Sequence, residues 1–196
     1  MLEHERIALS MIAFITGMMG FIESMIAVPA ASTAMAADAL SFVQHSVSAG
    51  FALRASTGLK RHRWTVLLQG AVMMVLGALV CVIAARRLVQ GSLPHPIIML
   101  VMGGIALAAN LSACTILLVA RRQMTGLKAV WRLSRADSVG SISVIAAALI
   151  VMVLQARGLT FSNIPDVVIG GGMAALFSAA GWRILYTGRS DANQAR

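Results

Sequence analysis

The chain alternates long apolar runs with short polar connections. A membrane helix rises about 1.5 Å per residue, so about 20 apolar residues cross the hydrocarbon core of a bilayer. Each run is long enough for one crossing, and the pattern therefore predicts an all-α membrane protein, a bundle of six transmembrane helices. The expected ranges are 7–28, 33–55, 64–85, 97–120, 129–155 and 167–186.

The composition supports a membrane protein. Hydrophobic residues make up 59% of the chain and charged residues 12%, and the mean hydropathy is +0.85. A water-soluble domain of 196 residues could not carry so apolar a surface. The net charge of +9 could suggest nucleic-acid binding, but the basic residues lie in or beside short connections, without interleaved aromatic residues. We therefore expect a lipid bilayer, and no nucleic acid, as the partner of this surface.

The distribution of Lys and Arg predicts the orientation of the bundle. Thirteen of the sixteen lie near the two ends of the chain or near the connections that follow the second and fourth runs. The other three are Arg86, Arg87 and Arg157. Because Lys and Arg of short loops stay in the cytoplasm, we expect both termini to be cytoplasmic, which requires an even number of crossings. The expected organisation is a transmembrane domain over 1–188 and a short cytoplasmic tail over 189–196.

Four ionisable residues fall inside the predicted helices, where each needs a physical reason. An ionised side chain at the bilayer centre costs at least about 2.5 kcal/mol. The four are Glu23, Asp38, His45 and Asp137. Asp38, Ser41 and His45 are spaced i, i+3 and i+7, so they share one face of the second helix. That face therefore carries a carboxylate, a hydroxyl and an imidazole.

Asp137 and Ser141 are four residues apart and share a face of the fifth helix. If this face meets that of the second helix, His45 and Asp137 can form a site within the membrane. An imidazole and a carboxylate suit a divalent first-row cation such as Zn²⁺. The alternative is a buried hydrogen-bonded pair that only orients the two helices. The residues alone do not decide between these interpretations.

Other features favour structural roles. Glu23 and Asp38 are first interpreted as structural. Asp166, which follows Pro165 at the start of the sixth helix, is predicted to complement the amino-terminal dipole of that helix. The glycines of the helices, among them Gly70, Gly77 and 170–172, are predicted to let helix backbones approach closely.

Five short motifs occur in order over nearly the whole chain, from about Ile12 to Leu185. They are Phe21-Ile22-Glu23-Ser24, Ala37-Asp38-Ala39-Leu40, Ala108-Ala109-Asn110-Leu111, the segment from Val130 to Asp137, and Ile164-Pro165-Asp166. Together they resemble the cation diffusion facilitator family, specifically its short members that consist of the six-helix transmembrane domain alone. The resemblance implies a homodimer that exports Zn²⁺ or a similar ion in exchange for protons, at a site between the second and fifth helices.

The site that the resemblance implies falls on Ser41 and His45 of the second helix and on Leu133 and Asp137 of the fifth. His45 replaces a carboxylate of the family, Ser41 is a weak neutral donor, and Leu133 cannot bind a metal. Asp38, one turn before Ser41 on the same face, can compensate. The predicted metal site is therefore His45, Asp137, Ser41 and Asp38, with weaker and less selective binding than a site of four strong ligands.

These observations favour a transporter of a divalent metal ion, with His45 as the group that exchanges protons, because histidine changes its charge near neutral pH. A second hypothesis is a non-transporting paralogue that acts as a membrane partner or regulatory subunit. An enzyme or redox carrier is not expected, because the sequence offers neither facing histidines for haem nor a nucleophile beside a base. No cofactor is expected, and the expected location is the inner (plasma) membrane of a bacterium.

Overall fold

The computed structural model describes residues 3–54, 59–121 and 128–194. In these residues the regular secondary structure is entirely helical, which confirms the predicted class. The helices are α1 (Glu3–Ala27), α2 (Thr33–Arg54), α3 (Leu59–Gln90), α4 (Pro96–Arg121), α5 (Lys128–Ala156) and α6 (Ile164–Gln194). All six predicted helices are present. The largest differences are the longer α3, which extends beyond its predicted range at both ends, and the later end of α6. In α3, Lys60, Arg61 and Arg63 are good helix formers that continue the helix before the apolar residues that predicted it.

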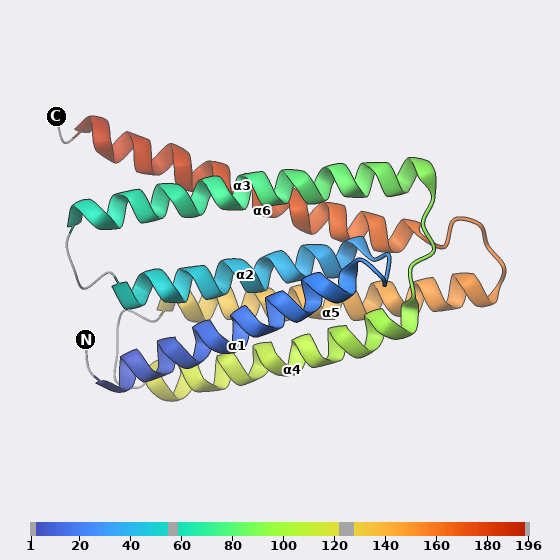
Figure 1. Cartoon of the computed structure of the whole chain (residues 1–196), viewed down its shortest axis with the longest axis horizontal. Coiled ribbons are helices and arrows are strands. Elements are labelled where there is room, and N and C mark those ends of the chain that lie inside the picture. The colour runs from blue at the N-terminus through green and yellow to red at the C-terminus, as the bar shows by residue number, and fades with distance from the viewer. Residues whose placement is uncertain (1–2, 55–58, 122–127, 195–196) are drawn as a thin grey trace.

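Four of the helices form a bundle, and the other two form a pair that packs against it (Figure 1). In the bundle, α1 contacts α2 and α4, and α5 contacts the same two helices. The pair consists of α3 and α6, which lie along each other and both contact α2. Helix α2 therefore touches four other helices and is the most enclosed element of the fold.

Small and flexible apolar side chains fill the interior of the four-helix bundle. The largest fully buried apolar side chain is Phe42 of α2, which packs among methionines and alanines from its own helix and from α1, α4 and α5. Methionine fills irregular gaps, and alanine lets helices approach closely. The main cluster comprises Met19, Ala27, Ala30, Ala34, Met35, Phe42, Met99, Met102, Ala106, Val144, Ala147 and Ala148.

Five of the helices contain stretches long and apolar enough to cross a membrane. These stretches are Arg6–Ala27, Leu67–Gln90, Pro96–Val119, Asp137–Ala156 and Ile164–Tyr186. The prediction of a multi-pass membrane protein is thus supported for five helices. Helix α2 is not among them because Asp38, Gln44 and His45 lower its hydropathy. These polar side chains point toward neighbouring helices rather than toward lipid, as the enclosed position of α2 allows.

The beginning of α1 and the end of α6 lie at the same end of the bundle (Figure 1). Helix α2 ends and α3 begins at this end of the bundle, and so do the end of α4 and the beginning of α5. Most of the Lys and Arg residues that the structure describes lie at or near these helix ends, whereas Arg86 and Arg87 lie near the end of α3 and Arg157 follows α5, at the opposite end. The described positive charges are thus unequally divided between the two ends of the bundle.

Close contacts between helices explain some of the glycines but not all. A Cβ atom on Gly181 of α6 would lie 2.6 Å from the carbonyl oxygen of Gly70 on α3, so these backbones touch. A Cβ on Gly170 would collide with the backbone of Thr33 at the start of α2. By contrast, nothing lies within 4 Å of a Cβ on Gly104 or Gly172. The predicted packing role is confirmed for Gly70 and Gly170 and wrong for Gly172.

Asp166 lies in the first turn of α6, as predicted, and its carboxylate also caps a second helix. Its carboxylate accepts hydrogen bonds from the Ser32 hydroxyl at 2.5 Å and from the backbone N–H groups of Thr33 and Ala34 at 2.7 and 3.1 Å. It therefore caps the amino end of α2 from the first turn of α6. The predicted position in the first turn of α6 is confirmed, and the cap on α2 is an additional role, because α6 brings this turn against the start of α2. Arg87 completes the cluster by donating to the Thr33 hydroxyl at 3.2 Å.

We expect Asp166→Ala to destabilise the protein by about 2–4 kcal/mol, because it leaves buried donors at the start of α2 without an acceptor. Asp166→Asn keeps one carbonyl acceptor and should lose less. Thermal unfolding of the two variants in the same detergent measures the difference. Equal unfolding temperatures for Asp166→Ala and the wild type would contradict the capping role.

Candidate functional site

One face of α2 carries the polar residues that the sequence singled out, and this face is buried. Asp38 and His45 have no exposed surface, and Ser41 is 2% exposed. Their spacing of three and four residues places them in line along the helix, directed at the interior of the bundle. The structure therefore brings together on one buried surface the three residues predicted from α2.

Asp137 of α5 meets this face. His45 Nδ1 lies 2.6 Å from Asp137 Oδ2, in a hydrogen bond between a fully buried imidazole and a carboxylate that is 3% exposed. The two residues are 92 positions apart in the sequence, so their meeting depends on how α2 and α5 pack. The predicted contact is present, whereas binding of a metal by this pair stays a prediction.

The other ring nitrogen of His45 has a different environment. His45 Nε2 is buried and has no hydrogen-bond partner among the described residues. In metal sites, a ligating histidine commonly donates one N–H to a carboxylate, and this bond orients the ring so that the second nitrogen can bind the ion. The bond to Asp137 leaves Nε2 as the nitrogen of His45 that is free to act as a ligand.

A chain of hydrogen bonds joins Asp38 to two further helices. Ser141 of α5 donates to Asp38 Oδ2 at 2.9 Å, and Asn110 of α4 donates through its amide nitrogen to the Ser141 hydroxyl at 3.1 Å. Ser41 donates to the backbone oxygen of Asp38 at 2.8 Å and approaches Asp38 Oδ1 at 3.4 Å. Asp38 thus lies at the junction of α2, α4 and α5.

Glu23 of α1 completes this group of buried polar side chains. It has no exposed surface, and neither of its carboxylate oxygens has a hydrogen-bond partner among the described residues. Three carboxyl groups and one imidazole therefore lie within the bundle, which is an unusual concentration of ionisable groups for a membrane protein interior.

A cavity of about 340 Å³ reaches the edge of this group from between α2, α3, α5 and α6. Ser41, Gln44, Asp137 and Ser143 form its polar part. The rest of its wall is mostly apolar and comprises Met73, Val139, Gly140, Met173, Leu176, Phe177 and Ala180. Since Ser41 and Asp137 border it, a small ion or water molecule has space to approach the His45–Asp137 pair from this side.

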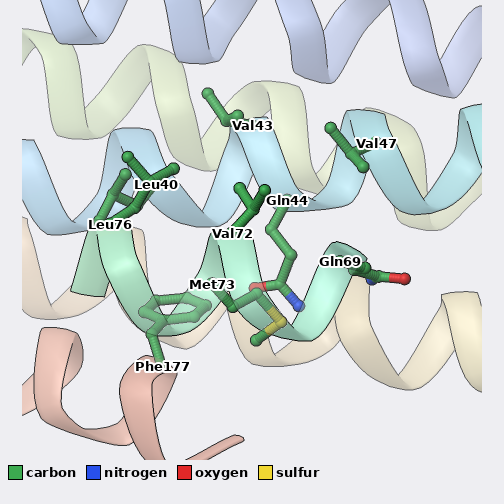
Figure 2. A pocket seen from close by; sticks show the side chains of 9 residues that line it. All are labelled: Leu40, Val43, Gln44, Val47, Gln69, Val72, Met73, Leu76 and Phe177. Atoms are coloured by element: carbon green, nitrogen blue, oxygen red, sulfur yellow. The ribbon is translucent and has the colours of Figure 1, made fainter. Parts of the chain in front are cut away.

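A second pocket, shown in Figure 2, lies beside the first but does not touch the candidate site. Apart from Gln44 and Gln69 its lining is apolar, with Phe177 and Met73 beneath α2. Its volume is about 20 Å³, enough for about one water molecule. None of His45, Asp137 and Asp38 lines it, so we regard the larger cavity as the one relevant to the site.

The group differs from a conventional closed metal site. Within the described residues, no three His, Cys, Asp or Glu side chains are arranged so that they could hold one metal ion. The side chain of Leu133, the fourth position implied by the family resemblance, lies outside the described residues. The structure thus brings together His45, Asp137 and Ser41, with Asp38 beside them, but only His45 and Asp137 are in direct contact as strong donors.

Asn110 was not among the residues predicted for the site. It is fully buried, and it is the only amide side chain in the apolar helix α4. The cost of burying an amide in lipid could have marked it, by the same reasoning that marked the charged residues. Its partner, however, follows only from the packing of α4 against α5.

Comparison with known proteins identifies no relative: no family model matches the chain, and neither does any curated protein.

Proposed function

We propose that the protein transports a divalent cation, Zn²⁺ or a similar ion, across a membrane in exchange for protons. His45 and Asp137 are the principal groups, and Ser41 and Asp38 are auxiliary oxygen donors. The cation is the substrate and not a resident cofactor. The proposal agrees with the resemblance to the cation diffusion facilitator family, which implies export by a homodimer with a site between its second and fifth helices.

The observation that carries the proposal is the His45–Asp137 contact. A buried imidazole is held by a carboxylate at 2.6 Å while its second nitrogen has no hydrogen-bond partner among the described residues. A pair that only joined two helices would need no unpartnered nitrogen inside the bundle, since a buried polar atom without a partner is costly. The arrangement is better suited to a histidine that binds something through Nε2.

The same histidine supports coupling to protons. A cation can bind His45 Nε2 only while that nitrogen carries no proton, because a metal ligand must be deprotonated. The hydrogen bond of 2.6 Å between Nδ1 and Asp137 orients the ring and leaves Nε2 as the atom for which cation and proton compete. Competition at one atom is what ion exchange requires.

We further propose that α2 is the sixth crossing, with both termini in the cytoplasm of a bacterial cell and the chain in its inner membrane. Six crossings place the beginning of α1 and the end of α6 on one side, in agreement with Figure 1. The positive charge associated with that end favours the cytoplasm. The enclosed position of α2 allows it to cross although it is less apolar than its neighbours.

Transport can be tested with the purified chain in proteoliposomes that contain a fluorescent zinc indicator. We expect Zn²⁺ entry when the lumen is more acidic than the bath, because outward movement of protons then drives the ion inward. Collapse of the pH gradient with a protonophore should reduce the rate to that of empty liposomes. Correctly folded protein that moves no Zn²⁺ or Co²⁺ under either condition would contradict the proposal.

The second candidate is a non-transporting paralogue that stabilises or regulates another membrane subunit. Leu133 and Ser41 favour it, because they remove strong ligands from positions where the family has them. In that case His45→Ala would leave cellular metal tolerance unchanged, whereas deletion of the whole chain would lower the abundance of a partner. Measurement of both effects in one strain separates the two functions.

A further inference from the structure

Two fully buried side chains, Glu23 and Asn110, have no part in the exchange proposed for His45 and Asp137. Both oxygens of the Glu23 carboxyl group and the amide oxygen of Asn110 lack hydrogen-bond partners among the described residues. Buried oxygen acceptors without partners are rare in native proteins, and a buried carboxylate without a partner is especially costly. These atoms therefore indicate that something is bound between the helices that carry them.

The acceptors are connected through Asp38. Glu23 lies one turn after Gly20 on α1, and Asp38 lies one turn before Phe42 on the antiparallel α2. A Cβ atom on Gly20 would lie 3.1 Å from Phe42 Cβ, so the packing of the two helices places Glu23 opposite Asp38. Asn110 reaches Asp38 from α4 through Ser141, by hydrogen bonds of 3.1 and 2.9 Å. Asp38 Oδ1 has only a weak approach from Ser41, at 3.4 Å, so it too has room for a stronger partner. Oxygen atoms from α1, α2 and α4 thus gather where the helices of the bundle meet.

Space around Asp38 is maintained by a glycine. A Cβ atom on Gly140 of α5 would lie 2.9 Å from Asp38 Oδ1. A larger residue would press on the oxygen that is least engaged by hydrogen bonds. Gly140 therefore leaves Asp38 Oδ1 accessible within the interior of the bundle.

The chemistry of this group differs from that of the His45–Asp137 pair. Its donors are two carboxyl groups and a neutral amide oxygen, with no nitrogen or sulfur ligand. Carboxylate and carbonyl oxygens are the ligands of hard cations such as Mn²⁺, Mg²⁺ and Ca²⁺, whereas imidazole favours Zn²⁺ and later transition metals. Two carboxylates together carry the charge that a divalent cation neutralises.

We propose that Glu23, Asp38 and Asn110 form a second cation-binding position, specific for an oxygen-preferring divalent cation, which shares Asp38 with the transport site but does not require the imidazole of His45. The alternative occupant is a proton shared between Glu23 and Asp38, since like charges at short range favour protonation of one of them. The proposal does not depend on zinc transport.

Binding of Mn²⁺ to the full-length protein in detergent tests the proposal, because free Mn²⁺ has a strong paramagnetic resonance signal that decreases on binding. We expect saturable binding that Mg²⁺ or Ca²⁺ reverses. Glu23→Gln preserves shape and removes charge, and it should weaken Mn²⁺ binding by roughly tenfold or more. Asn110→Ala should weaken it less, because a neutral donor is lost. The matched control, His45→Ala, should bind Mn²⁺ within about twofold of the wild type while losing Zn²⁺.

The two metals distinguish this proposal from the previous one. Zn²⁺ binding that depends on His45, without any Mn²⁺ binding by the wild type, overturns the oxygen site and leaves the transport site intact. Mn²⁺ binding that depends on Glu23, without Zn²⁺ binding by the wild type, supports the oxygen site and contradicts the transport site. Equal Mn²⁺ affinity in Glu23→Gln and the wild type also overturns the proposal. If Glu23→Gln does not elute as folded protein, Asn110→Asp replaces it, and the added carboxylate must then tighten Mn²⁺ binding.

Discussion

His45→Ala is expected to lower proton-driven Zn²⁺ transport by roughly 100-fold, because it removes both the nitrogen that can bind the ion and the group that holds the proton. Asp137→Asn keeps the size of its side chain but removes its charge. The loss should be nearly as large, since the amide neither stabilises a charged imidazole nor attracts a dication. The initial rate of zinc entry into acidic-lumen proteoliposomes measures both variants.

The chain offers a matched control for this experiment. His95 is an exposed histidine in the connection between α3 and α4, away from the bundle interior. His95→Ala removes the same atoms from the protein and should leave the transport rate unchanged. If His45→Ala and His95→Ala transport zinc equally well, the His45–Asp137 pair is structural and the transport site lies elsewhere.

Gly170→Ala is expected to destabilise the fold by at least about 2 kcal/mol, because the added methyl group must enter the backbone of α2 at Thr33. Neither backbone can turn aside as a flexible side chain could, so α2 and α6 must separate. The separation would also loosen the Asp166 cap in the adjacent turn of α6. Thermal unfolding in detergent should therefore begin at a clearly lower temperature.

Gly172→Ala provides the comparison within the same helix. Nothing lies within 4 Å of a Cβ atom at this position, so the methyl group meets no protein atom. Alanine also favours helix formation over glycine by up to about 1 kcal/mol. This variant should match the wild type or exceed it in stability. An equal loss of stability in both variants would show that the contact between Gly170 and Thr33 is not the cause.

Much of the fold could be predicted because membrane helices are recognisable from local properties. Run length and hydropathy identified all six helices and their order. They did not predict that four other helices enclose α2, which allows this helix to carry more polar side chains than a helix exposed to lipid. The enclosure depends on how the helices pack, and the mean hydropathy of one helix contains no information about its neighbours.

The candidate site could be predicted only as a set of residues. The cost of burying charge singled out Glu23, Asp38, His45 and Asp137, and helical spacing placed two of them on one face. Which side chains meet depends on the rotation of each helix about its axis. For this reason the contact between His45 and Asp137, at 2.6 Å, was predicted only on the condition that the two helix faces meet, and the approach of Asn110 to Asp38 through Ser141 was not foreseen.

The cap that Asp166 places on α2 joins residues more than 130 positions apart in the chain. During synthesis, α2 is complete long before the turn that carries Asp166 emerges from the ribosome. Until then the first N–H groups of α2 must find water, lipid head groups or an insertion factor as temporary partners. Final anchoring of the helix that carries His45 is thus a late event in biogenesis, controlled by arrival of the last membrane segment.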